Sequence, residues 1–211
     1  MGGIFSPNSP TMIFLGRVAD IVILSLLWLV CSIPIITIGP ATSALYYVTL
    51  KMVRDEDGSI VKSFFHGLKD NLGQGIVLTV LFLICAFCLY YHFVLSFSIA
   101  GTLQIVMEIV ALLLLACFVS IVMYTFPLQA RFRNTIFGTL KNAYILSVTK
   151  LPSTIMLLLI HLLPVLFMLI FPDIFVKAIP LAVCLFPGGI AYISSIRFVA
   201  IFSDGEKAAA A

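Results

Sequence analysis

The chain is built from long apolar stretches, and its charged residues gather in the gaps between those stretches. Of its 211 residues 62% are hydrophobic and 10% are charged, whereas charged residues make up roughly a quarter of an ordinary soluble domain. So few polar groups cannot cover a water-soluble globule of this size. We therefore expect an integral membrane protein that contacts membrane lipid.

Four of the apolar stretches are long enough to cross a membrane. A helix needs roughly 20 mainly apolar residues to span the ~30 Å hydrocarbon core. The stretches that reach this length are Gly75–Phe97, Leu103–Phe126, Leu151–Phe171 and Val176–Phe202. We expect each of them to form a transmembrane helix.

The start of the chain allows two interpretations. Thr11–Ile33 is long enough to cross, and it is followed by the apolar stretch Ile35–Val53. In one interpretation the first stretch crosses and Ala41–Val53 lies on the membrane surface. In the other, residues 34–40 form a tight outer turn and the chain comes straight back, since nineteen helical residues reach about 28 Å.

The placement of the cations favours the second interpretation. Lys and Arg in short loops mark the cytoplasmic side of a membrane protein. With six crossings, eleven of the twelve cations are cytoplasmic and only Lys177 is outside, whereas with five crossings Arg17 is outside as well. We therefore predict an all-α polytopic helix bundle with six transmembrane helices in three hairpins, and five as the alternative. Both termini of a six-helix protein are cytoplasmic. Residues 1–207 form one membrane domain, and 208–211 are read as an expression scar.

Two short amphipathic segments lie in the gaps that hold most of the cations. In residues 60–70 apolar side chains recur on one helix face and Lys62 and Lys69 lie on the other, and residues 131–149 repeat this pattern. Both are too short and too charged to cross, so we expect two cytoplasmic amphipathic helices at the membrane interface or against a partner. The candidate partner contacts are Phe64, Phe65, Leu68, Lys69, Asn71, Arg131, Arg133, Phe137 and Lys141.

Charged residues and helix breakers inside the spans are further candidates for function. Asp20 and Arg197 fall at similar depths, so we expect an ion pair between them, with Arg197 reaching the lipid headgroups as the alternative. The breakers are Gly39 and Pro40 at the start of the second helix and Pro187, Gly188 and Gly189, which interrupt the sixth. Such breaks can bind a substrate in a transporter, but they are more often kinks and close-packing points.

Motifs of catalysis and cofactor binding are missing from the chain. It contains no phosphate-binding Gly-x-x-x-x-Gly-Lys-Ser/Thr loop, no Gly-x-Ser-x-Gly elbow and no His-Glu-x-x-His pair. Its histidines are isolated from one another, and its five cysteines fall within apolar stretches. We therefore expect no enzyme, no catalytic residue, no metal, no cofactor and no nucleic-acid partner.

Three runs of residues resemble a known family. They are TIGPATSALYY at 37–47, RDEDGS at 54–59 and FFHGLKDN at 64–71, and the preceding LLWL at 26–29 fits as well. These runs resemble the YesL-like family of bacterial membrane proteins, a domain of unknown function, and the resemblance covers nearly the whole chain.

The resemblance implies a setting rather than a mechanism. Members of that family tend to be encoded beside sugar ABC importers and polysaccharide-use genes in Firmicutes. It therefore implies a multi-pass protein of the bacterial cell membrane that acts as a non-catalytic accessory subunit beside the permease subunits of a carbohydrate ABC importer. The alternatives are a small secondary transporter and a membrane regulator of a sugar-responsive histidine kinase.

Overall fold

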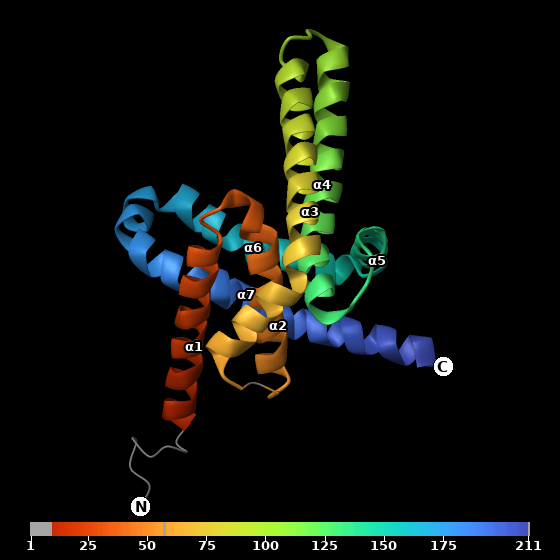
Figure 1. Cartoon of the computed structure of the whole chain (residues 1–211). Coiled ribbons are helices and arrows are strands. Elements are labelled where there is room, and N and C mark those ends of the chain that lie inside the picture. The colour runs from red at the N-terminus through yellow and green to blue at the C-terminus, as the bar shows by residue number, and fades with distance from the viewer. Residues whose placement is uncertain (1–9, 57, 211) are drawn as a thin grey trace, which may run out of the picture.

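The protein is all helical in the part that the structure describes (Figure 1). This computed structural model describes residues 10–56 and 58–210, with side chains from 11 to 204 apart from residue 57; the end of the 208–211 run read as a scar lies outside it. The elements are α1 (Pro10–Cys31), the 3-10 turn η1 (Ile35–Thr37), α2 (Ile38–Val53), α3 (Ile60–Ser96), α4 (Thr102–Arg131), α5 (Ile136–Thr149), α6 (Leu151–Ile170) and α7 (Pro172–Ala210). The predicted all-α polytopic bundle is confirmed.

Five helices of the described chain are long and apolar enough to cross a membrane, namely α1, α3, α4, α6 and α7. The second helix, α2, is shorter. Its 16 residues reach about 24 Å, which is less than the ~30 Å hydrocarbon core. Length and composition therefore support five spans, the number predicted from the sequence as the alternative to six. Helix α2 is too short to count as a span by this measure.

Nevertheless, the helices are paired as three hairpins. Arg17, near the start of α1, forms a 3.0 Å ion pair with Asp55, which follows α2, so α2 returns to the side on which α1 begins. Lys150 before α6 pairs at 3.2 Å with Asp204 near the end of α7. The α3–α4 hairpin extends well beyond the other helices in Figure 1, and α6 and α7 cross it at a steep angle.

Neither expectation for residues 41–53 was fully right, because α2 is the central helix of the bundle rather than a surface helix or an ordinary span. From Gly39 to Met52 it is buried except at Thr42, Tyr47 and Lys51. Hydrogen bonds join it to four neighbours: Trp28 of α1 to Thr42, Gly39 to Thr79 of α3, Ser43 to Gln129 of α4, and Thr49 to Ser195 of α7.

Close approach of helix backbones explains the small residues of α2. A Cβ atom at Gly39 would lie 2.1 Å from the Thr79 hydroxyl, and one at Gly75 would lie 2.7 Å from the Pro40 ring. Small residues allow membrane helices to pack closely where water supplies no driving force. Gly39 and Pro40 are therefore a packing point at the start of α2.

Two predicted segments differ from the structure. Residues 60–70 are not a separate interfacial helix but the first turns of the 37-residue α3, and these turns lie at an angle to the rest of that helix in Figure 1. Pro187, Gly188 and Gly189 do not interrupt the last helix, because α7 runs unbroken from Pro172 to Ala210.

Candidate functional site: a cationic cleft at the polar end of the bundle

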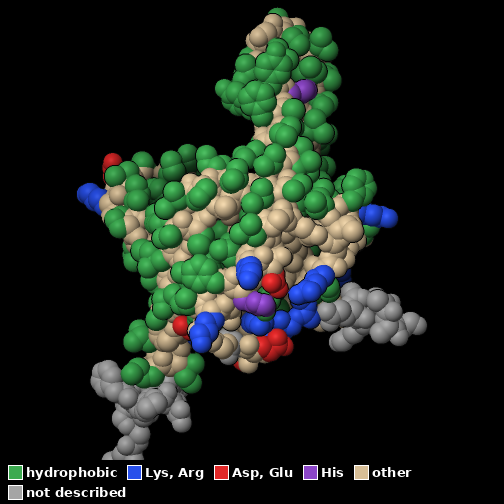
Figure 2. Space-filling view, viewed as in Figure 1, with side chains coloured by type: hydrophobic (Ala, Val, Ile, Leu, Met, Phe, Trp, Pro, Cys, Tyr) green, Lys and Arg blue, Asp and Glu red, His purple; other side chains and the backbone are tan. Residues whose placement is uncertain are grey.

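The two segments singled out in the sequence meet around a cleft. It lies between the first turns of α3 and the link from α4 to α5, and it encloses about 630 Å³. Its walls are formed by Tyr47, His66, Gly67, Asp70, Asn71, Gly73, Gln74, Gln129, Ala130, Arg131, Phe132, Arg133 and Asn134. Figure 2 shows Lys and Arg side chains gathered at this end of the molecule, whereas hydrophobic side chains cover most of the remaining visible surface.

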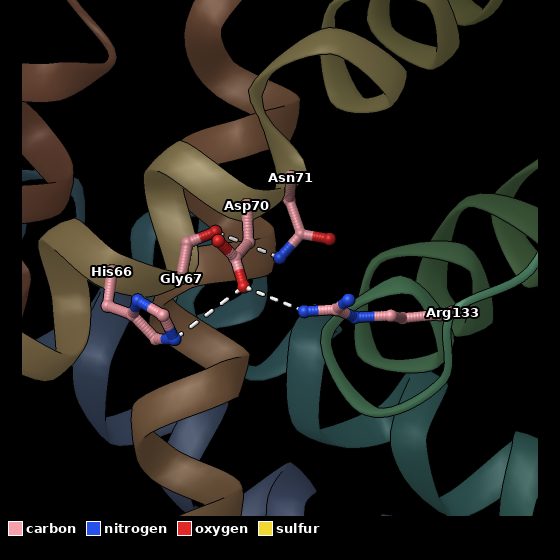
Figure 3. Close-up of polar contacts among 5 residues, drawn as sticks. All are labelled: His66, Gly67, Asp70, Asn71 and Arg133. Atoms are coloured by element: carbon pink, nitrogen blue, oxygen red, sulfur yellow. Dashed lines mark hydrogen bonds and ion pairs between the residues drawn. The ribbon is translucent and has the colours of Figure 1, made fainter.

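Three charged or titratable side chains meet at the mouth of the cleft. His66 and Asp70 are one turn apart on α3, and His66 Nε2 lies 3.6 Å from Asp70 Oδ2. Arg133 reaches the same carboxylate from the α4–α5 link, with Nη2 3.5 Å from Oδ2 (Figure 3). The carboxylate therefore lies between a cation and an imidazole that come from different parts of the chain.

The α4–α5 link is held in place by backbone contacts. Helix α4 ends at Arg131, and Thr135 caps α5 by accepting a 3.2 Å hydrogen bond from the Gly138 amide. The Gln74 side chain of α3 donates a 3.0 Å hydrogen bond to the Asn134 carbonyl. These bonds fix the link against α3 and so keep Arg133 at the cleft.

Amide side chains form the deeper wall. The Ser43 hydroxyl donates a 2.8 Å bond to Gln129 Oε1, and Gln129 Nε2 donates a 3.4 Å bond to the Asn71 carbonyl. Asn71 in turn donates a 2.9 Å bond to the Gly67 carbonyl (Figure 3). Because one hydrogen of each side-chain NH2 is engaged in these bonds, each amide keeps a second donor.

An aromatic ring closes the side next to α2. Gly67 packs on Tyr47, where an added Cβ would lie 3.0 Å from the ring. The Lys51 ammonium lies 4.5 Å from the centroid of the same ring, a cation–π distance. The Lys51 ammonium thus adds a positive charge next to the Tyr47 ring that lines the cleft.

The predicted partner contacts divide into buried and exposed residues. Phe64 is wrong as a contact, because its side chain is 0% exposed in the core. Leu68 packs partly against that core, and Asn71 is half-buried. The exposed members are Phe65, Lys69, Arg133, Phe137 and Lys141, and Arg131 is half-buried at the cleft.

Helix α5 presents four large apolar side chains outward, whereas Ile136, Leu140 and Leu146 pack against the core. Its buried positions are Thr139, Ala143 and Ser147, which are small and follow one face at intervals of four. The small residues let α5 approach the bundle closely, and they leave an outward stripe of large residues. The exposed side chains of this stripe are Phe137, Tyr144, Ile145 and Val148, with Phe137 82% exposed.

The other predicted site residues lie away from the cleft. Arg197 is exposed on α7, and the expected ion pair between Asp20 and Arg197 stays a prediction. Gly188 packs against α1, where its amide donates a 3.0 Å bond to the Ser25 hydroxyl. Gly189, the next residue, has open space beside it.

Sequence reasoning missed Gln74, Gln129 and Asn134 as residues of one site. The two glutamines had a local signal, because a buried amide in or beside an apolar stretch needs a polar partner. The pairing itself could not be inferred, since Gln129 and Asn71 are 58 residues apart. No group of three or more His, Cys, Asp or Glu side chains comes together in the part of the chain that the structure describes.

Part of the chain matches a known family. Residues 21–93 match the family model described as "Protein of unknown function, DUF624", which is consistent with the resemblance to the YesL-like family. The match extends from α1 into α3 and includes all of α2. No curated protein and no solved structure was found to be similar to the chain. The chain is a helical protein of the membrane type, and its residues 21–93 are similar to the DUF624 family.

Proposed function

We propose that the chain is a non-catalytic accessory membrane subunit that binds a partner protein through the outward stripe of α5, defined by Phe137, Tyr144, Ile145 and Val148. The observation that carries the proposal is the orientation of α5. A 14-residue helix is about 21 Å long and cannot cross the bilayer, yet its largest apolar side chains face away from the bundle.

Charge beside the stripe is compatible with contact with a protein as well as with lipid headgroups. Lys141 is exposed on α5, and Arg133 lies in the link just before it with its side chain 96% exposed. Aromatic and aliphatic anchors beside cations are the composition of many protein interfaces. By the positive-inside bias, this end of the bundle faces the cytoplasm.

The partner class comes from the family resemblance. It points to the permease subunits of a bacterial carbohydrate ABC importer, which would place the protein in the bacterial cell membrane. With six crossings both termini of the chain would be cytoplasmic. A regulator of a histidine kinase would use the same surface and is separated from this proposal by the identity of the partner.

Transport by the chain alone is not favoured by the packing at the helix breakers. A Cβ at Gly39 would meet Thr79 and Gly75, and one at Gly188 would meet Ile21 and Ser25. Backbone at these points is therefore in contact with neighbouring helices, and the large cavities lie elsewhere, at the polar end and between α3 and α4.

Affinity purification in a mild detergent tests the proposal. We expect the full chain to recover sugar permease subunits, and we expect Phe137→Ala combined with Tyr144→Ala to reduce that recovery at least about fivefold, since loss of two interface aromatics commonly costs more than 1 kcal/mol. Phe87→Ala combined with Tyr91→Ala is the matched control, because both side chains are exposed on the distal half of α3. Recovery of the wild-type chain without any permease would contradict the proposal.

A further inference from the structure

We infer that the cleft between α3 and the α4–α5 link binds a phosphate group, carried by an anionic lipid headgroup or by a small soluble phosphate ester. The inference goes beyond the proposed function and does not rest on it, because it concerns a ligand of the purified chain rather than a partner protein.

The charge balance of the cleft favours an anion. Its formally charged lining residues are Arg131 and Arg133 against Asp70, so the lining carries a net formal charge of +1 with His66 neutral. Lys51 adds a positive charge behind the Tyr47 ring. A concave site with an excess of positive charge attracts anions.

The hydrogen-bonding groups also fit a phosphate. An Arg side chain carries five N–H donors and no acceptor, and Asp70 Oδ2 lies 3.5 Å from one nitrogen, Nη2, of Arg133. The second amide hydrogens of Asn71 and Gln74 add donors along the same wall. Arginine binds phosphate through two parallel N–H bonds, a geometry that a single chloride ion cannot match.

Size and position agree with such a ligand. The volume of about 630 Å³ lies within the range of small-molecule sites, roughly 300–1,000 Å³. The cleft is at the cation-rich end of the bundle, beside the end of α4, where a span of 30 residues leaves the membrane. A headgroup and a soluble ester can therefore both reach it.

In this arrangement Asp70 competes with the ligand for Arg133. A carboxylate and a phosphate are both acceptors for the same guanidinium, so an incoming anion must displace Asp70 or bind beside its negative charge. Removal of that charge is then expected to tighten binding.

Calorimetric titration of the full chain in maltoside micelles tests the inference, with glycerol 3-phosphate, dioctanoyl phosphatidylglycerol and dioctanoyl phosphatidylcholine as probes. We expect saturable binding of at least one of the two anionic probes. Binding of glycerol 3-phosphate identifies a soluble ester, and binding of phosphatidylglycerol alone, without phosphatidylcholine, identifies a headgroup.

Four variants decide whether the cleft is the site. We expect Arg133→Gln to weaken binding about tenfold, the loss of one charge-assisted contact, and Asp70→Asn to strengthen it about threefold. Lys141→Gln and Lys177→Gln are the matched controls, since both are exposed cations outside the cleft, and they should change affinity less than about twofold.

Three results would overturn the inference: no saturable binding of either anionic probe, equal weakening by Arg133→Gln and Lys141→Gln, or weaker binding by Asp70→Asn. Folding does not obscure the test, because the Arg133 side chain is almost fully exposed and Asp70→Asn is expected to gain affinity. Gel filtration of each variant verifies that it is folded.

Discussion

The adjacent glycines Gly188 and Gly189 of α7 have different surroundings. A Cβ at Gly188 would lie 2.6 Å from the Ile21 carbonyl and 2.7 Å from the Ser25 hydroxyl, whereas Gly189 has no neighbour within 4 Å. The carbonyl belongs to the backbone of α1 and cannot move aside. We therefore expect Gly188→Ala to force α1 and α7 apart and to lower the free energy of unfolding by about 1–3 kcal/mol.

Gly189→Ala is the matched control at this scale. Alanine in an open helical position is neutral or stabilises by up to about 1 kcal/mol, because glycine loses more backbone entropy on folding. Thermal unfolding of the two variants in detergent gives the comparison. Equal midpoints for the two variants would show that α1 and α7 do not approach each other at Gly188.

At the scale of elements, α2 is joined to its neighbours by hydrogen bonds between buried hydroxyls and amides. The Thr49 and Ser195 hydroxyls lie 2.8 Å apart, and both side chains are fully buried between α2 and α7. In membrane proteins such pairs couple by about 0.6 kcal/mol on average, with a maximum near 1.7 kcal/mol. We expect a double-mutant cycle of Thr49→Val and Ser195→Ala to show a coupling in this range.

The cycle is measured by unfolding in mixed micelles, with each variant compared with the wild-type chain. Ser120→Ala is the control, because the Ser120 hydroxyl bonds only to Ala116 of its own helix, at 2.8 Å. Combined with Thr49→Val it should be additive. Additivity of Thr49→Val and Ser195→Ala would mean that the two hydroxyls do not hold α2 against α7.

At the scale of the whole molecule, the sequence predicted how long the helices are but not which helices pack against one another. Hydropathy placed α4 and α6 to within a few residues, because lipid requires long apolar helices. It could not show that α2 is central, since a buried helix and a lipid-facing helix are both apolar. It also made Phe64 a candidate partner contact, because periodicity identifies an apolar face without saying whether that face meets a partner or the protein's own core.

The cleft was not predicted, and only the two segments that border it were singled out, since its polar contacts join α3 to residues about 60 positions later. The placement of the cations left one point open, namely the side of the membrane on which Arg17 lies. The Arg17–Asp55 ion pair bears on that point. It puts the start of α1 on the same side as the residues that follow α2. Arg17 therefore belongs with the cation-rich end of the bundle, as in the three-hairpin plan.

That plan predicts which ends of the helices are accessible from outside the cell. In a cysteine-free background, a membrane-impermeant maleimide added to intact cells should label Ser98→Cys, in the turn between α3 and α4, and should not label Ser59→Cys or Thr11→Cys. The reason is that the cations lie with residues 11 and 59 and on the opposite side from residue 98. Labelling of all three after permeabilisation shows that each thiol can react. Outside labelling of Thr11→Cys with Ser59→Cys protected would place α1 alone across the membrane and would overturn the α1–α2 hairpin.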